Sequence, residues 1–373
     1  MRLKLGVAVV KRPQKTWLYF RARRYAEAQG FYPSKSISQD APTLSPDAIK
    51  HLDLMILNKI KLLQFGTPLK NARFLTDNFL REGFGAVIGR LTKALACGYL
   101  YNRTVLFGNS HLRYDFPYEP LSSHCLEDIK EYKKAPAKWL RPARDRCLTD
   151  LNEYDSGVTE FNFLPQKEKV VHNYRYGPLF YLDPYFSLGP PLLQRLNFVH
   201  PAVLPHSLAY IQGLILDGFL RLKPKYEAHL EERRKSMGFK SPVIGVHIRK
   251  GDAEPKRRFL PRQIYFETVE RVADETGIRT VFVSTDSDKI IRQLPKHSGL
   301  EFIYDDQEKR YNTYIAGMLG EQPSLKQQET MTAVKNIYLL GACHRIIGGP
   351  SLWVSAAGGI AYFRRKEFVL TYI

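Results

Sequence analysis

The feature that most constrains the fold is a regular alternation of strand and helix patterns from residue 243 onward. Short apolar runs alternate there with helical patterns of about 10–15 residues. Because strands connected by helices run parallel, the alternation predicts a Rossmann-like parallel sheet. Ligands of such sheets bind beyond the carboxyl ends of the strands. The expected strands are Val243–Ile248, Thr280–Thr285, Glu301–Ile303 and Arg345–Gly348, and the expected helices are Tyr265–Thr276, Asp288–Leu294, Thr330–Ala342 and one that begins at Ser351.

The chain before residue 243 is less regular. Its patterns predict a first strand at Leu5–Val10, a glycine turn, helix and strand over Phe84–Leu106, and helices over Ser207–Leu222 and Tyr226–Met237. Repeated prolines make residues 109–205 look irregular, which is typical of a binding surface. A length of 373 residues suggests two domains. We expect an N-terminal α/β domain over residues 1–239, with a helical linker over 206–239, and a Rossmann-like domain over residues 240–373.

Charge narrows the class of partner. Lys+Arg number 56 against 37 Asp+Glu, a formal net charge of +19, so the chain should attract polyanions, anionic membranes or phosphorylated small molecules. No run approaches the ~18 apolar residues of a membrane span, and the first apolar run is too short for a secretory signal. The four cysteines form no C-x-x-C pair; two disulfides are possible, but reduced thiols are expected. We therefore expect a cytoplasmic protein, soluble or peripheral to a membrane.

A cationic turn follows the strand Val243–Ile248. His247 and Arg249 are two residues apart, so both project to one face of the strand. Arg249 and Lys250 place two cations at the strand end, and Gly251 lets the chain turn sharply. A guanidinium beside an ammonium suits a diphosphate, particularly when no metal helps. The alternative is a solvated basic turn.

Two carboxylates follow the next strand, in Asp286-Ser287-Asp288. They have three interpretations: a metal site on a diphosphate, a helix N-cap, or a carboxylate that orients Arg249. Since cations already cover the phosphate charge, the second and third are favoured and no metal is expected.

Two glycine-containing turns are weaker signals. Gly83-Phe84-Gly85 precedes a helix and either lets the backbone approach a nucleotide or only makes a turn. The run from Gly348 to Ser351 opens the last helix, whose amides are able to receive a phosphate; a plain Ser N-cap is the alternative.

Five ordered motifs resemble the core α1,6-fucosyltransferase family, which includes rhizobial nodulation enzymes and animal enzymes acting on N-glycan cores. The similarity runs from about residue 80 to about residue 365, and the first 75 residues carry none of it. The motifs are Gly83–Gly85, Leu112–Tyr114 with Pro120–Ser122 and Cys125, Phe239–Arg249, Val283–Asp286, and Asn336–Ser351.

The resemblance implies a GT-B fold, two Rossmann-like domains with the site in the cleft, the first on the acceptor side and the second binding the donor. It implies metal-independent, inverting transfer of L-fucose from GDP-fucose to a sugar hydroxyl of a glycan, expected α1,6 to GlcNAc. Arg249 and Lys250 then bind the diphosphate, with Ser351 near the phosphates. His247 and Tyr114 lie beside the nucleoside, with Gly83 and Gly85 at the same donor site. Asp286 is a carboxylate that catalysis requires.

The sequence departs from the family pattern in three places. Lys250 stands where the family usually has arginine, so a single ammonium charge replaces a guanidinium that binds a phosphate with two parallel hydrogen bonds. Asn336 stands where the family has an aspartate that recognises guanine; it either faces the base or lies on the outer helix face and touches only water. The family's general base falls on Lys256 or Arg257. The nearest carboxylates are Glu254 and then Asp252.

Other functions stay open on the sequence alone. An α1,2-fucosyltransferase also carries a His-x-Arg-x-Gly-Asp element, which His247–Asp252 matches. A GDP-sugar-binding homologue without activity is a further alternative. The net charge is the single support for a nucleic-acid-binding protein, and neither RNP aromatics nor zinc-finger spacing accompany it. The animal enzymes' membrane anchor, stem and SH3 domain are not recognised here, so a layout like that of a bacterial soluble enzyme is expected. The acceptor, a chito-oligosaccharide, a capsular or lipid-linked glycan or an N-glycan core, is undecided.

Overall fold

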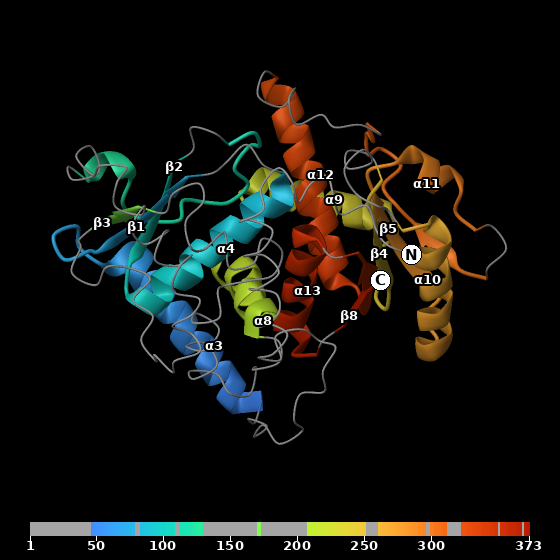
Figure 1. Cartoon of the computed structure of the whole chain (residues 1–373), viewed down its shortest axis with the longest axis horizontal. Helices are drawn as coiled ribbons and strands as arrows, with labels where there is room; N and C mark the ends of the chain where they lie inside the picture. The colour runs from blue at the N-terminus through green and yellow to red at the C-terminus, as the bar shows by residue number, and fades with distance from the viewer. Residues whose placement is uncertain are drawn as a thin grey trace, which may run out of the picture. The chain divides into compact units, whose positions relative to one another are not determined.

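The computed structural model describes residues 46–78, 83–108, 112–129, 170–172, 207–250, 260–295, 299–311, 322–349, 351–367 and 369–373. The expected strand Leu5–Val10 and the candidate bases Asp252 and Glu254, with Lys256 and Arg257, lie outside these ranges. The chain divides into two compact units (Figure 1). Unit 1 comprises Met1–Asn78, Ala96–Phe107 and His124–Leu208; unit 2 comprises Phe79–Leu95, Gly108–Ser123 and Ala209–Ile373.

The division differs from the domain boundary expected after residue 239. Unit 2 begins at Ala209 and also takes in two earlier segments. The reason lies in contacts that composition does not reveal. Tyr118 forms an isolated antiparallel bridge with Leu222, and the buried hydroxyl of Tyr338 donates to the carbonyl of Leu216 at 2.9 Å. The helices expected to link two domains are therefore part of the second unit.

Unit 2 contains a five-stranded sheet in which every pairing is parallel. Its strand order is β6-β5-β4-β7-β8. Strands β5 and β6 therefore lie on one side of β4, and β7 and β8 lie on its other side. This change of side makes the gap between β4 and β7 the topological switch point, where doubly wound sheets bind ligands. The strands are β4 (Ile244–Ile248), β5 (Thr280–Thr285), β6 (Glu301–Ile303), β7 (Arg345–Gly348) and β8 (Leu370–Tyr372).

Helices cover both faces of this sheet because its central strands are apolar on both sides. Ile244, Val246 and Ile248 of β4 pack in one core with α10. A Cβ on Gly245 would meet Cys343 and Leu340 on the opposite face, the side that carries α12 and α13 (Figure 1). The helices are α8 (Ser207–Gly213), which continues as the π-helix η6 (Leu214–Phe219), α9 (Pro224–Ser236), α10 (Arg262–Thr276), α11 (Asp288–Arg292), α12 (Pro323–Ala342) and α13 (Leu352–Arg365).

Unit 1 has a smaller sheet of order β2-β1-β3, in which β1 and β3 are parallel. Buried polar side chains tie its pieces together. The Gln64 side chain exchanges hydrogen bonds with the backbone of Val105 at 2.7 and 3.0 Å, and Arg103 donates to the Phe74 carbonyl. Its elements are α3 (Pro46–Lys61), the π-helix η1 (Leu62–Gly66), β1 (Phe74–Asn78), β2 (Thr104–Gly108), the 3-10 turn η2 (Leu126–Asp128) and β3 (Val170–His172); α4 (Phe84–Tyr101) is divided between the units.

The sequence predicts the regular part of the chain well. The bounds expected for β5, β6 and β7 are the observed ones. Helix α12 begins at Pro323, seven residues before the expected start. Proline is favoured at the first position of a helix, whereas the apolar pattern alone places the start of this helix later. Helix α3 and strands β1, β3 and β8 were not expected, since three- to five-residue strands give little periodic signal.

Candidate functional site

The candidate site lies at the carboxyl ends of β4, β5 and β7. His247 on β4 is in register with Ser284 on β5 and with Gly348 on β7. Arg249 and Lys250 continue directly from β4 and are half-buried. The parallel register therefore gathers the predicted cationic turn and the glycine run at the switch point of the sheet.

His247 is held as a neutral imidazole. Its ring stacks on Trp353 of α13, with centroids 5.6 Å apart and 13° between the planes. Its Nδ1 lies 3.1 Å from the Ser284 hydroxyl. Burial and the charge of Arg249 lower the pKa of His247 to about 3. A neutral ring offers one N–H donor and one acceptor, so His247 binds by hydrogen bonding and carries no charge near neutral pH.

Asp286 fixes the backbone of the cationic turn. Its Oδ1 accepts a hydrogen bond from the backbone N–H of Lys250 at 2.7 Å. The expected carboxylate partner was the side chain of Arg249, whereas this contact is with the peptide that follows it. At the start of α11 the N-cap position is Ser287, whose side chain makes no capping hydrogen bond. The geometry thus favours an orienting carboxylate over an N-cap.

The early glycine turn packs closely against the first turn of α13, beside His247. A Cβ on Gly85 would lie 3.1 Å from the backbone nitrogen of Trp353, whereas one on Gly83 would meet nothing within 4 Å. Phe84 lies edge-on to Tyr114, with ring centroids 5.3 Å apart. Tyr114, Gly85 and His247 are therefore linked through Phe84 and Trp353, although they are far apart in the sequence.

Ser351 caps the last helix. Its side-chain oxygen accepts from the backbone N–H of Val354 at 3.1 Å, the usual N-cap bond. The capping interpretation is confirmed, and a role beside phosphates stays a prediction.

Asn336 is buried, which excludes the alternative in which it lies on the outer helix face and touches only water. It is 3% exposed, and its Nδ2 lies 3.3 and 3.2 Å from the two carboxylate oxygens of Glu308. A carboxylate only accepts hydrogen bonds, so the amide must turn its nitrogen toward Glu308 and its oxygen away. That oxygen is buried and has no hydrogen-bond partner among the described residues.

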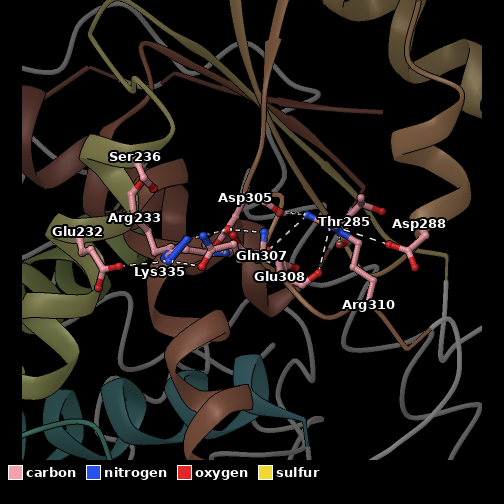
Figure 2. Close-up of polar contacts among 11 residues, drawn as sticks. Glu232, Arg233, Ser236, Thr285, Asp288, Asp305, Gln307, Glu308, Arg310 and Lys335 are labelled. Atoms are coloured by element: carbon pink, nitrogen blue, oxygen red, sulfur yellow. Dashed lines mark hydrogen bonds and ion pairs between the residues drawn. The ribbon is translucent and has the colours of Figure 1, made fainter.

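Glu308 belongs to a buried ionic network that runs from α9 past the loop after β6 to the end of β5 (Figure 2). Lys335 is 1% exposed, and its Nζ lies 2.7 Å from Asp305 and 2.8 Å from Glu308. Arg233 lies 3.5 Å from Asp305. Burial alone would raise the pKa of Asp305, but the charge and hydrogen bond of Lys335 outweigh it and lower that pKa.

The network reaches the candidate site through Arg310. Its guanidinium donates to the carbonyls of Thr285 at 3.2 Å and Asp305 at 2.9 Å, and lies 3.6 Å from Glu308. Thr285 is the last residue of β5 and directly precedes Asp286. The buried charges therefore brace the strand end from which Asp286 holds the cationic turn.

A search against models of protein families matches this chain to the alpha-(1,6)-fucosyltransferase N- and catalytic domains over residues 38–314. That is 277 of the 373 residues. The chain belongs to this family. The match begins well before residue 75, so the expectation that the first 75 residues carry no similarity is wrong for residues 38–75. It ends before Asn336 and Ser351.

Solved fucosyltransferases are similar over most of the chain. NodZ alpha-1,6-fucosyltransferase soaked with GDP-fucose is 15% identical, with 78% of this chain and 92% of that chain covered and a TM-score of 0.46. A mutant of Arabidopsis thaliana FUT1 in complex with GDP is 12% identical, with coverages of 92% and 77% and a TM-score of 0.47. POFUT1 in complex with GDP-fucose is 12% identical, with coverages of 81% and 97% and a TM-score of 0.43.

Membership in the alpha-(1,6)-fucosyltransferase family confirms the predicted family and the predicted class of enzyme, a glycosyltransferase. The parallel sheets of the two units confirm the α/β fold class expected for a GT-B enzyme. The cleft between the two units stays a prediction.

Several residues of this fucosyltransferase site escaped the sequence analysis. Ser284 lies beside His247 on the neighbouring strand β5. Its position two residues before Asp286 is the signal that would have identified it. Trp353 lies in the first turn of α13, just after Ser351. A Cβ on Gly349 would lie 3.6 Å from the Tyr265 hydroxyl, whose pKa is raised by burial and by Asp286. Tyr265 therefore lies beside the glycine run at the carboxyl end of β7.

Neither a metal cluster nor a membrane span is found in the described ranges. Among those residues, no group of three or more His, Cys, Asp or Glu side chains is placed to hold a metal ion. In the same ranges, no helix has the length and apolarity needed to cross a bilayer. Cys343 is a buried free thiol, and Cys125 is exposed.

Proposed function

We propose that this member of the family transfers L-fucose from GDP-fucose to a sugar hydroxyl of an oligosaccharide or glycan, in α1,6 linkage to GlcNAc. The observation that carries the proposal is the cationic turn at the switch point, where Asp286 fixes the backbone of Lys250. A diphosphate placed there meets Arg249 and Lys250 beyond the carboxyl end of β4, as ligands of doubly wound sheets do.

The reaction breaks the bond between the anomeric carbon of fucose and the β-phosphate oxygen of GDP. The acceptor hydroxyl oxygen forms the new bond from the opposite side, which inverts the configuration, and its proton passes to a general base. Arg249 and Lys250 stabilise the negative charge that develops on the leaving GDP. Glu254 or Asp252 is the proposed base, on sequence position alone.

His247 has a binding role in this proposal. Because its pKa is about 3, the imidazole stays neutral at the pH of the reaction and adds no charge to the cationic turn. Its ring, held between Trp353 and Ser284, is pre-oriented to hydrogen-bond the nucleoside. Tyr114 and Asn336 are proposed as further contacts of the nucleoside, and Gly83, Gly85 and Ser351 as backbone and hydroxyl contacts of the donor.

We also propose that transfer needs no metal ion, since two cations already face the diphosphate. The test is transfer activity in excess EDTA. Unchanged turnover is expected; loss of activity that Mn²⁺ or Mg²⁺ restores would assign Asp286 and Asp288 to a metal site.

A screen of nucleotide sugars tests the donor. The full chain is assayed for hydrolysis and transfer with GDP-fucose, GDP-mannose and UDP-sugars, and GDP, UDP and ADP are titrated by calorimetry. We expect turnover with GDP-fucose and tight binding of GDP alone among the three nucleotides. Linkage analysis of a fucosylated GlcNAc-containing product then separates α1,6 from α1,2 transfer. Tight GDP binding without turnover on any acceptor would favour an inactive homologue.

The cellular setting is a proposal of the same kind. We propose a cytoplasmic enzyme that contacts anionic membrane surfaces peripherally. The net charge of +19 supports attraction to such a surface.

A further inference from the structure

Helix α3, the π-helix η1 that continues it and the turn after η1 expose large apolar side chains. Five large hydrophobic side chains of this region are each between 40% and 60% exposed. They are Leu54, Met55, Leu62, Phe65 and Leu69. Met55 and Leu62 are seven residues apart, two helical turns, so they lie on one side of the helix. We call this set the outer face of α3.

The opposite side of α3 is fixed in unit 1. Ile56 and Ile60 are buried at 0% and 1% exposure. One turn on, the Gln64 side chain bonds both backbone groups of Val105. These contacts settle which side of the helix is turned toward the described part of the core of unit 1, and the outer face lies on the other side.

Lysines border the outer face. Lys50, Lys61 and Lys70 are exposed, and Lys59 lies with its ammonium 4.7 Å from the centre of the Tyr99 ring. Helix α3 also carries two acids, Asp47, which is exposed, and Asp53, which is half-buried. An apolar stripe with a cationic border is the composition of helices that lie in a membrane interface.

We infer that the outer face of α3 docks unit 1 onto an anionic lipid bilayer, with the helix lying in the plane of the surface. The leucines and Met55 enter the boundary between headgroups and acyl chains, while the lysines meet lipid phosphates. Such helices bury their apolar face about 5–10 Å deep, and each nearby lysine strengthens binding to anionic lipid. This inference does not depend on the donor or the reaction.

A second copy of the chain would fit this face less well than an anionic bilayer. In a symmetric dimer the same patch meets itself, so Lys50 and Lys61 of one copy would approach the same lysines of the other. The repulsion would add to that between two chains of charge +19. An anionic bilayer has the complementary charge.

The test is flotation of the full chain with vesicles. Phosphatidylglycerol vesicles are compared with phosphatidylcholine vesicles at low and high salt. We expect binding to the anionic vesicles that weakens with salt and little binding to the neutral ones. Lys50→Gln with Lys61→Gln should lower the partition coefficient about 30-fold, because each lysine near an anionic surface strengthens binding about fivefold. Leu54→Ser with Leu62→Ser should lower it about tenfold, because the apolar side chains that enter the bilayer are lost.

Matched controls come from unit 2. Ile264 on α10 is 37% exposed, and Lys240 is exposed; Ile264→Ser and Lys240→Gln should leave the partition coefficient unchanged. Calorimetry with GDP should give the same affinity for every variant, which keeps this test apart from that of the donor. Each variant's unfolding midpoint is measured to verify folding.

Three results would overturn the inference. One is no preference for anionic over neutral vesicles. Another is an equal loss of binding in the α3 variants and the unit 2 controls. The third is a monomer–dimer equilibrium, measured by sedimentation, that the Leu54→Ser/Leu62→Ser variant abolishes, because the face would then bind a second copy.

Discussion

Asn336→Asp should destabilise unit 2, in a way that depends on pH. The substitution keeps the size of the side chain but replaces a donor that lies 3.2–3.3 Å from the Glu308 oxygens with a second carboxylate. Two unit charges about 4 Å apart repel by roughly 4 kcal/mol at an effective dielectric of about 20. Lys335 and Arg310 offset part of this. The carboxyl pair avoids the rest by binding one proton, which then makes the hydrogen bond that the amide made.

The shared proton determines how much the free energy of unfolding falls in this variant and how that loss changes with pH. An unfolded Asp has a pKa near 3.9, and a remaining repulsion of roughly 3–4 kcal/mol would keep the shared proton bound up to about pH 6.5 in the folded variant. Between those values the folded protein binds a proton that the unfolded chain does not, so the free energy of unfolding falls by about 1.4 kcal/mol for each unit that pH rises. We therefore expect a loss relative to wild type of about 3–4 kcal/mol at pH 7 and about 1.5 kcal/mol at pH 5.

Urea denaturation at pH 5, 6 and 7 measures this loss. Replacing Trp17 and Trp139 with Phe leaves Trp353 as the reporter of unit 2. Gln263→Glu, the same chemical change at an exposed position of α10, should cost less than about 0.5 kcal/mol at each pH. Adding Glu308→Gln to Asn336→Asp keeps the net charge and should restore most of the stability. Equal stability of Asn336→Asp and wild type at pH 7 would refute the contact between Asn336 and Glu308.

The remaining predictions concern the candidate site. Arg249→Ala should lower turnover by roughly 10²–10³ with the unfolding midpoint unchanged; if more than about a third of the turnover survives, Arg249 does not stabilise the leaving group. Gly85→Ala should lower the free energy of unfolding, measured in urea, by about 1–3 kcal/mol, because its Cβ would press on the Trp353 backbone. Gly83→Ala should change the same free energy by less than about 0.5 kcal/mol. Equal losses in the two variants would contradict the close packing. Since the pKa of His247 is about 3 against about 6.5 unfolded, the unfolded chain binds more protons between these values, so wild type should lose about 2 kcal/mol of stability between pH 7 and pH 5 through this group. His247→Asn should lack that part of the pH dependence, and parallel curves for the two proteins would show that the ring is not held neutral.

The sequence predicts those parts of the site that follow directly from a strand. His247, Arg249 and Asp286 were found because strand ends are recognisable from buried apolar runs and the carboxyl ends of parallel strands meet at one edge. The partner of Asp286 was harder to predict, because the backbone of Lys250 and the side chain of Arg249 are equally near along the chain.

Contacts between distant segments could not be predicted from spacing. The approach of Gly85 to Trp353 joins residues 268 positions apart, and no periodicity encodes it. The sequence carries no signal that Asp305, Glu308 and Lys335 are buried, since charged residues are rarely buried unless paired. Their burial follows from the meeting of α12 with the loop after β6, which only the folded chain reveals.

Unit 2 is assembled from segments made at very different times during synthesis. The segment 112–123 belongs to it, and there the Asp115 backbone N–H donates to the Thr330 hydroxyl at 3.0 Å, across 215 residues. The Asp115 side chain is also bound by Lys225 and by the Tyr226 hydroxyl, both at 2.6 Å. At about 5–20 residues per second, a ribosome needs roughly 10–40 s to travel from residue 115 to residue 330. The segment carrying Tyr114 can meet Lys225 and Tyr226 about halfway through that interval, but it lacks Thr330 until the end. A fragment beginning at residue 209 would therefore lack an early part of its own unit, and that early part is completed only by residues made late.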